Sequence, residues 1–314
     1  MQVGARRAVP LREYMRYINL YNSGELHERV RLAYARLASC DLCPHDCGAN
    51  RLRGEMGFCR AGIRPKVASA NVHRGEEPPI SGTKGSGTIF FSHCTLRCLF
   101  CQNFPISQLG NGEETTTAGL AARMLKLQSQ GVHNINFVTP GHFLPQILAA
   151  LRLAIPQGFK LPIVWNSSGY ERADALSLLD GVVDIYLPDM KYTAEEPAAN
   201  FSSAPGYREI NRSAVLEMFR QVGHLDLDRD GIAVKGLVIR HLVLPEGAAG
   251  SSETLHWIAE NLGRETHIAL MNQFFPAHQA SGVKGIHRKI TSAEYERAVT
   301  ALEEAGLENG WIQE

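Results

Sequence analysis

Seven cysteines carry the most chemical information in this sequence of 314 residues, because all of them lie between Cys40 and Cys101. Thiolates are strong ligands of soft metals, and such clustering favours metal binding over scattered structural thiols. An odd number of cysteines in a long chain argues against a framework of disulfides. The spacing divides the seven into a group of three and a group of four.

The group of three is a C-x3-C-x2-C motif made of Cys94, Cys98 and Cys101. Three thiolates on one short loop match three irons of a 4Fe–4S cluster, and the fourth iron then stays open to a small-molecule donor. The alternatives are a zinc site and three structural thiols, but zinc sites usually bring four ligands in two pairs. We therefore interpret this motif as the ligand set of an open-site 4Fe–4S cluster.

The group of four consists of Cys40, Cys43, Cys47 and Cys59. Four thiolates can close a tetrahedral zinc site or ligate a second 4Fe–4S cluster completely. The spacing leaves zinc, an auxiliary cluster and unmetallated thiols open as interpretations. A closed site offers no free coordination position, so its expected role is structural or electron-relaying.

The elements that must position these cysteines follow an alternating pattern from residue 82 onward. Apolar strand-like runs cover 88–92, 134–138, 162–166, 183–187, 237–244 and 267–271, and helix-period segments cover 117–130, 143–155, 171–179, 213–222, 252–262 and 293–305. This alternation predicts parallel βαβ units, arranged as an open doubly wound sheet or a partial barrel. Both architectures place chemistry at the carboxyl ends of the strands, and the three-cysteine motif directly follows the first strand-like run.

The chain is predicted to divide into an N-terminal helical segment (1–39), a cysteine-rich metal-binding module (40–80) and the αβ region (81–314). The module is rich in Cys, Gly and Arg and poor in apolar runs. Because so small a unit builds little core, a metal is expected to hold it together. Residues 74–87 are glycine-containing but lack the order of a P-loop, and we interpret them as a linker.

Composition excludes several classes of protein. Hydrophobic residues make up 44% of the chain and charged residues 20%, which is typical of a globular protein and excludes a disordered one. With 32 basic and 32 acidic residues the net charge is zero, so neither nucleic acid nor a membrane is an expected partner. No apolar run reaches the ~20 residues of a membrane helix. Residues 1–7 lack the apolar core of a signal peptide, which predicts a cytoplasmic protein.

With Phe100 before its last cysteine, the C-x3-C-x2-C loop resembles the radical S-adenosylmethionine (SAM) superfamily. More closely, the chain resembles the pyruvate formate-lyase activating enzyme-like branch, with an extra N-terminal four-cysteine module. Further stretches agree with that branch in order, at 85–92 (GSGTIFFS), 101–107 (CQNFPIS), 164–170 (VWNSSGY), 184–191 (DIYLPDMK) and 239–245 (IRHLVLP). The resemblance covers roughly residues 80–290 and implies an α/β fold, a partial (β/α)6 TIM-like barrel.

The resemblance also implies an activity. The open iron of the cluster would chelate SAM, and one electron would cleave the sulfonium bond to methionine and a 5′-deoxyadenosyl radical that abstracts hydrogen from a substrate. That substrate is expected to be a glycine of a partner enzyme, as in glycyl-radical activases, or alternatively a small molecule or peptide. An electron donor such as flavodoxin or ferredoxin is the implied partner. A zinc-bound interaction or scaffold protein is the alternative from another class.

Contacts to SAM are carried over position by position. Phe100 stands where the family places an aromatic near adenine. Asn166 and Ser168 match the polar turn that contacts the ribose, where Gly169 permits a tight turn. Phe100 follows the first strand-like run of the αβ region, Asn166 ends the third run, and Ser168 follows it.

Charged residues at later strand ends complete the expected SAM site. Asp189 and Lys191 follow the fourth strand-like run, and Arg240 lies on the fifth. An arginine inside a barrel requires a carboxylate partner, because an unpaired buried charge is costly. The Gly-Gly-Glu element by which the branch holds the SAM amine is missing after the second run, where Thr139 and His142 are the expected substitutes.

Overall fold

One ten-stranded sheet organises the computed structural model, which describes residues 15–312. Its strands are β1 (Lys66–His73), β2 (Ser86–Phe91), β3 (Glu113–Glu114), β4 (Ile135–Val138), β5 (Ile163–Ser167), β6 (Ile185–Pro188), β7 (Asp226–Leu227), β8 (Ala233–Leu242), β9 (His267–Met271) and β10 (Gly310–Ile312). They are ordered β10-β9-β8-β6-β5-β4-β2-β1-β3, and β7 pairs with β8.

The six predicted strand-like runs correspond to β2, β4, β5, β6, β8 and β9. Each of these strands pairs in parallel with the next in the chain. Strands that follow one another in space as they do in sequence wind in one direction, so the sheet is an open, partial barrel rather than a doubly wound sheet. The predicted α/β fold class is confirmed.

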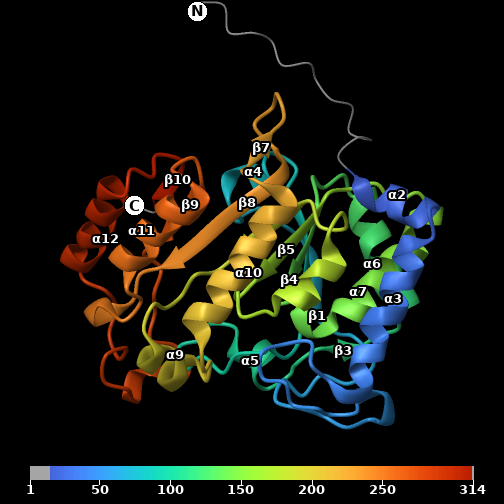
Figure 1. Cartoon of the computed structure of the whole chain (residues 1–314), viewed down its shortest axis with the longest axis horizontal. Coiled ribbons are helices and arrows are strands. Elements are labelled where there is room, and N and C mark those ends of the chain that lie inside the picture. The colour runs from blue at the N-terminus through green and yellow to red at the C-terminus, as the bar shows by residue number, and fades with distance from the viewer. Residues whose placement is uncertain (1–14, 313–314) are drawn as a thin grey trace, which may run out of the picture.

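Helices surround this sheet in the view of Figure 1. They are α2 (Arg16–Asn22), α3 (Glu25–Ala35), α4 (Pro78–Ser81), α5 (Phe104–Ser107), α6 (Thr117–Ser129), α7 (Leu144–Ala154), α8 (Ala173–Leu176), α9 (Glu195–Ser202), α10 (Tyr207–Val222), α11 (Ser251–Leu262) and α12 (Ser292–Glu304). Helices α2 and α3 lie in the segment predicted to be helical, whose residues 1–14 are outside the described part of the chain. The Thr116 side chain caps α6 by accepting a hydrogen bond from Gly119 N.

Alternation along the strands sorts their side chains between two layers. Ile135, Phe137 and Trp165 belong to the core cluster shared with the outer helices. Val164 and Val238 belong to a separate buried cluster, which we take as the barrel interior because successive strand residues face opposite sides. By the same alternation Asn166, Asp189 and Arg240 follow the interior face towards the carboxyl ends of β5, β6 and β8.

The segment 74–87, interpreted from the sequence as a linker, has a packing role instead. It contains the short helix α4, whose Pro78 and Pro79 occupy the first helical turn, where proline is tolerated. Ile80 of this helix is fully buried in the cluster of the barrel interior. The segment therefore fills part of the barrel interior, and it places Glu77 near Arg240.

Additional strands extend the sheet beyond the six predicted ones. Strand β1 pairs antiparallel with β2, although it lies in the range predicted for the cysteine module. Strand β10 adds in parallel to β9 at the opposite edge. Apart from two valines the residues of β1 are small or polar, and only Val67 is buried, which explains why its pattern gave no strand signal.

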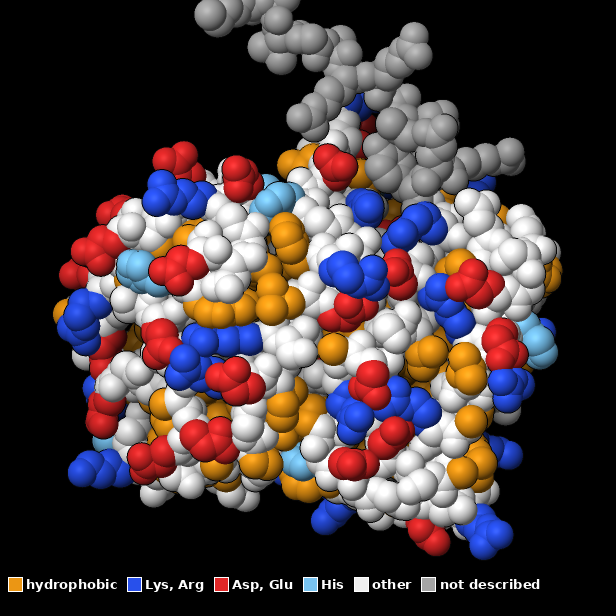
Figure 2. Space-filling model, viewed as in Figure 1, with side chains coloured by type: hydrophobic (Ala, Val, Ile, Leu, Met, Phe, Trp, Pro, Cys, Tyr) orange, Lys and Arg blue, Asp and Glu red, His pale blue; other side chains and the backbone are white. Residues whose placement is uncertain are grey.

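Both cysteine loops lie at one end of the barrel. In Figure 1 the loops of residues 40–65 lie near α5 and β3, at the bottom of the view. Charged side chains of both signs are interspersed over the face shown in Figure 2. Within residues 15–312, no helix combines the length and apolar character that crossing a membrane requires.

Candidate functional site

The three-cysteine loop connects the end of β2 to α5 and is fixed by the last residues of α9. Arg97 N donates to Ser202 O at 2.9 Å, and Leu99 N donates to Phe201 O at 2.8 Å. The last carbonyls of a helix lack partners within the helix, so the loop supplies the donors that the end of α9 needs. This pairing holds the loop against an element about a hundred residues later in the chain.

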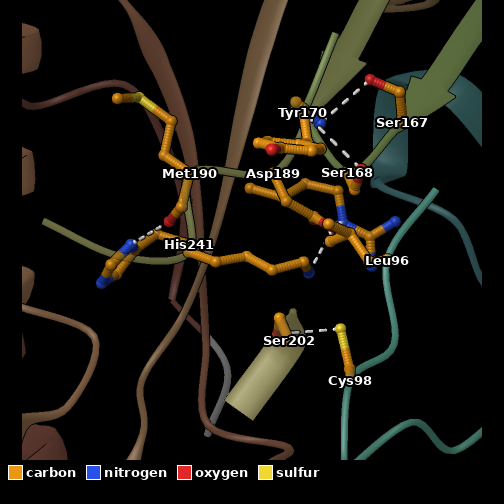
Figure 3. Close-up of polar contacts among 12 residues, drawn as sticks. Leu96, Cys98, Ser167, Ser168, Tyr170, Asp189, Met190, Ser202 and His241 are labelled. Carbon is orange, nitrogen blue, oxygen red and sulfur yellow. Dashed lines mark hydrogen bonds and ion pairs between the residues drawn. The ribbon is translucent and has the colours of Figure 1, made fainter. Parts of the chain in front are cut away.

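Every sulfur of this loop has a hydrogen-bonding partner. Leu96 N donates to Cys94 Sγ at 3.3 Å and Ser202 Oγ donates to Cys98 Sγ at 3.0 Å, while Ser107 Oγ lies 3.2 Å from Cys101 Sγ. Figure 3 shows the Ser202 and Cys98 side chains pointing towards each other. Donors aimed at sulfur stabilise thiolate ligands and tune iron–sulfur clusters. The surroundings of these three sulfurs therefore fit a cluster.

Burial makes these thiols hard to ionise without a metal. It raises the pKa of the Cys94 thiol to about 12 and that of Cys98 to about 11, and the Lys191 ammonium limits the rise at Cys98. A metal that binds such thiols must displace their protons. The sulfurs are thus sheltered ligands rather than exposed nucleophiles.

A cavity of about 170 Å³ lies beside the loop and collects six of the predicted site residues. It is lined by Cys98, Phe100, Cys101, Gln102, Asp189, Lys191, Arg240, Leu242, Met271, Gln273, Phe274 and Phe275. Phe100 is buried and packs edge-on against Phe274, with ring centroids 5.5 Å apart. The cavity therefore has cysteine sulfurs, aromatic rings and charged groups in its lining.

The charges at this cavity alternate in sign. Lys191 Nζ lies 2.6 Å from Asp189 Oδ2, and Arg240 Nε lies 3.6 Å from Asp189 Oδ1 and 3.5 Å from Glu77 Oε1. Burial lowers the pKa values of Lys191 and Arg240, but the neighbouring anionic groups together outweigh it, so both pKa values are raised overall. These groups are Asp189 and Cys98 at Lys191, and Asp189, Glu77 and Glu76 at Arg240. Arg240 therefore has the carboxylate partner that its interior position requires, and both cations stay charged.

The polar turn after β5 lies next to this charged group. Asp189 N donates to Ser167 O, and Tyr207 OH donates to Ser168 O at 2.9 Å. Gly169 has a φ of +69°, and a Cβ there would collide with Asp189 O, so the tight turn expected at this glycine is present. Asn166 is buried at the end of β5. Neither Asn166 nor Ser168 lines the cavity.

The two residues proposed to replace the Gly-Gly-Glu element occupy different environments. Thr139 has a φ of +54° and its N–H donates to Asn166 O at 2.9 Å. His142 is buried, its Nε2 lies 2.9 Å from Ser92 O, and burial lowers its pKa to about 3. His142 is therefore a neutral core histidine. Neither side chain belongs to the cavity lining.

The four-cysteine loop is compact, and one of its sulfurs lies close to a buried cation. A Cβ at Gly57 would collide with Cys47 Sγ, so only glycine allows the backbone before Cys59 to approach that sulfur. Arg51 is 1% exposed, and its Nη1 lies 3.8 Å from Cys40 Sγ. Among the described residues it forms no ion pair with a carboxylate, so the thiolates are the available counter-charge.

The two cysteine loops contact each other through residues that neighbour the cysteines. His45 Nε2 lies 2.7 Å from Thr95 O, and the His45 ring stacks on Phe58 at 3.7 Å. Arg97 donates to Phe58 O at 2.7 Å, and its guanidinium lies over the same ring. The segments between the cysteines of one loop are therefore packed against those of the other.

Across residues 15–312, no three Cys, His, Asp or Glu side chains lie close enough together to hold a metal ion as they stand. The groups that surround the sulfurs provide another test of whether the two loops suit a bound metal. The hydrogen-bond donors at the three-cysteine loop favour negatively charged sulfur, and so does the buried Arg51 at the four-cysteine loop, which has no carboxylate partner among the described residues. Both sets of residues fit bound metal by that test.

Sequence reasoning missed Glu77, Arg51 and Ser202. Glu77 lay in the segment interpreted as a linker, where two following prolines concealed a buried helix. Arg51 lies within the four-cysteine spacing, and an arginine among metal ligands was an available signal. Ser202 lies 104 residues from Cys98, so no local pattern could have connected them.

No family model matches the chain. Over 290 residues it is 30% identical to the uncharacterized protein MJ0674 of Methanocaldococcus jannaschii, covering 89% of this chain and 79% of that protein. Among solved structures, HydG, a maturase of the FeFe-hydrogenase, superposes with a TM-score of 0.51 at 11% identity, covering 76% of this chain and 54% of HydG. HydG from Carboxydothermus hydrogenoformans (TM-score 0.49, 12% identity, 95% of this chain and 68% of that one) and TYW1 with a lysine-pyruvate adduct bound (0.44, 10%, 69% and 73%) match more weakly.

Proposed function

The chain belongs to the family of the archaeal protein MJ0674, and we propose that it is a radical SAM enzyme whose active-site cluster is held by Cys94, Cys98 and Cys101. The similarity to HydG, a radical SAM enzyme, extends to the fold and supports this proposal. The observation that carries it is the three-cysteine loop itself. Each of its sulfurs has a hydrogen-bonding partner, and a cavity with charged and aromatic walls lies beside it.

When bound, the cluster supplies the single electron that cleaves SAM to methionine and a 5′-deoxyadenosyl radical. The residues of the chain bind and orient SAM. Lys191 and Arg240 offer cations to its carboxylate, and Asp189 holds both cations in place. Phe100 and Phe274 exclude water from the cavity, which protects a reactive radical.

The four-cysteine loop is proposed to hold a second metal, either zinc or an auxiliary 4Fe–4S cluster. The support is the buried guanidinium of Arg51, which needs an anionic partner, and the close approach of Gly57 to Cys47. Its contact with the three-cysteine loop through His45 suits a structural role for zinc or an electron-relaying role for a cluster.

For the substrate, we propose a glycine Cα in a partner enzyme, with an electron donor such as flavodoxin or ferredoxin as the second partner. The resemblance to activating enzymes supports this, as does the open sheet, which leaves room at the mouth for a protein segment. A glycyl-radical enzyme with α-deuterated glycine should transfer deuterium into 5′-deoxyadenosine. Transfer from an added small molecule or peptide instead would assign the substrate to that class.

The proposal is tested by purifying the protein anaerobically and measuring iron, sulfide and zinc, then 5′-deoxyadenosine formed from SAM with dithionite. We expect iron–sulfur absorbance and product from the wild type, and neither cluster-dependent product nor full iron from Cys98→Ala. A Cys40/Cys43 double variant is the control for the second site. Colourless protein with stoichiometric zinc, or persistent product from Cys98→Ala, would overturn the proposal and favour a zinc-bound interaction protein.

A further inference from the structure

Two buried hydroxyl groups form a chain of hydrogen bonds that ends at the sulfur of Cys98. Ser202 Oγ is 3.0 Å from Cys98 Sγ, and Tyr192 OH is 2.7 Å from Ser202 Oγ. Ser202 is 0% exposed and Tyr192 is 3% exposed, so water does not compete for these bonds. Figure 3 shows Ser202, at the end of α9, directed at the Cys98 sulfur.

The direction of both bonds follows from a metal-bound thiolate. Cys98 then carries no proton, so Ser202 must donate its only hydroxyl proton to the sulfur. The Ser202 oxygen is left to accept, and Tyr192 O–H is the donor that faces it. A hydroxyl that accepts a hydrogen bond becomes a stronger donor, so the two bonds reinforce each other in this buried setting.

The other two sulfurs lack such a pair. Cys94 accepts from the backbone N–H of Leu96 at 3.3 Å, and Cys101 is paired with Ser107 at 3.2 Å. Among the described residues, no second hydroxyl lies behind Ser107. The hydrogen bonding at the three sulfurs is therefore unequal, and the shortest of these contacts belongs to Cys98.

We propose that Tyr192 and Ser202 raise the reduction potential of the cluster at the three-cysteine loop, acting as positioning residues that never touch SAM. This inference rests on the proposed function. Reduction adds one electron from a low-potential donor, such as a reduced flavodoxin or ferredoxin, and moves no proton. The added negative charge is shared with the ligand sulfurs, so a polarised donor at Cys98 stabilises the reduced state more than the oxidised one.

The position of the pair links this tuning to the SAM site. Tyr192 directly follows Lys191, whose ammonium lies at the same cavity as Cys98. Lys191 N also donates to Tyr207 OH, which fixes the backbone that carries both side chains. The segment after β6 therefore presents a cation to the cavity and a hydroxyl to Ser202 from adjacent residues.

The test is a redox titration of the anaerobically purified full chain, followed by electron paramagnetic resonance. Ser202→Ala should reduce the equilibrium constant for cluster reduction about tenfold, which is 59 mV for a one-electron couple. Tyr192→Phe should shift it in the same direction by less, and Ser202→Thr, which keeps the hydroxyl, should restore it. Any signal from the four-cysteine loop should stay unchanged and serve as an internal reference.

Ser107→Ala is the matched control, because it removes one hydroxyl beside Cys101 with no second hydroxyl behind it. We expect a smaller shift from Ser107→Ala than from Ser202→Ala. Equal potentials in wild type and Ser202→Ala, at equal iron content, would overturn the inference while SAM cleavage by the wild type left the proposed function standing. A wild type that binds no cluster at the three-cysteine loop would overturn both.

Discussion

The groups that stabilise negative charge on the sulfurs differ between the two cysteine loops. The loop of four rests on Arg51, a full positive charge with no carboxylate partner in the described chain. The loop of three has a backbone amide and two serine hydroxyls beside its sulfurs, and Lys191, which acts on Cys98, is paired with Asp189 at the adjacent cavity. A fixed cation suits a site that keeps one state, whereas neutral donors and an adjacent cavity suit a site that changes charge and binds a ligand.

Cysteine spacing therefore gives the number of ligands at each loop, whereas the residues around the sulfurs indicate what the bound metal does. Removing a sulfur should affect the two loops unequally, and so should removing what lies behind it. The contacts of His45 and Phe58 with the other loop set a limit on how independent the two can be.

The largest difference is expected between Cys94→Ser and Cys43→Ser. The first removes one of only three ligands at the proposed catalytic cluster and should abolish 5′-deoxyadenosine formation. The second should lower activity about 10- to 100-fold, as for the loss of a supporting interaction. Product and metal content are measured on both variants. Equal loss of activity in both would contradict the separation of roles.

Arg51→Met should destabilise the protein by about 3 kcal/mol, because it leaves buried thiolates without their cation. Metal should be lost from the four-cysteine loop first. Thermal unfolding and metal analysis of the purified holoprotein provide the measurement, and Arg51→Lys, which keeps a positive charge, should recover part of the stability. If Arg51→Met keeps its full metal content, Arg51 is not the counter-charge.

Lower pH should weaken the region between the loops through His142. This residue bonds to Ser92 next to the three-cysteine loop, and both burial and the charge of Arg51 disfavour its protonation. Its pKa is about 3 when folded against 6.5 otherwise, so the unfolded chain binds more protons between these values. Stability is complete above pH 6.5 and should fall by about 1.4 kcal/mol per pH unit below it.

Denaturant unfolding at pH 7, 6 and 5 measures this dependence. His142→Gln cannot titrate and should flatten the profile over that range, whatever its stability at pH 7. An unchanged pH profile in this variant would show that other groups are responsible.

The smallest expected effect is that of His45→Leu. It removes the hydrogen bond to Thr95 and the stacking on Phe58, a loss of about 1 kcal/mol. If the loops depend on each other, this variant should bind metal normally at both loops but cleave SAM more slowly. Arg220→Leu, which removes ion pairs with Asp180 and Glu217 outside both cysteine loops, is the control. Identical turnover in His45→Leu and wild type would show that the loops work separately.

The sequence was informative wherever a pattern is local. Periodicity located the six parallel strands, and motif positions placed Phe100, Asp189, Lys191 and Arg240 at one cavity. The sequence carried no signal where an element has a weak hydrophobic pattern, or where contacting residues lie far apart in the chain. Strand β1 has small, half-exposed residues, and α4 begins with two prolines. Ser202 and Glu77 come from elements whose approach to the site depends on the folded barrel, so no spacing could reveal them.

The hydrogen bonds between the three-cysteine loop and the end of α9 have a consequence for biosynthesis. The four cysteines from Cys40 to Cys59 emerge from the ribosome together and can take up metal while the rest of the chain is unmade. The loop around Cys98 meets its partners only after Ser202, 104 residues later, has been synthesised. Because nascent chains fold from the N-terminus onward, the two sites should mature in a fixed order. Cellular machinery that delivers iron to the second site would then meet a chain that has been made at least as far as Ser202.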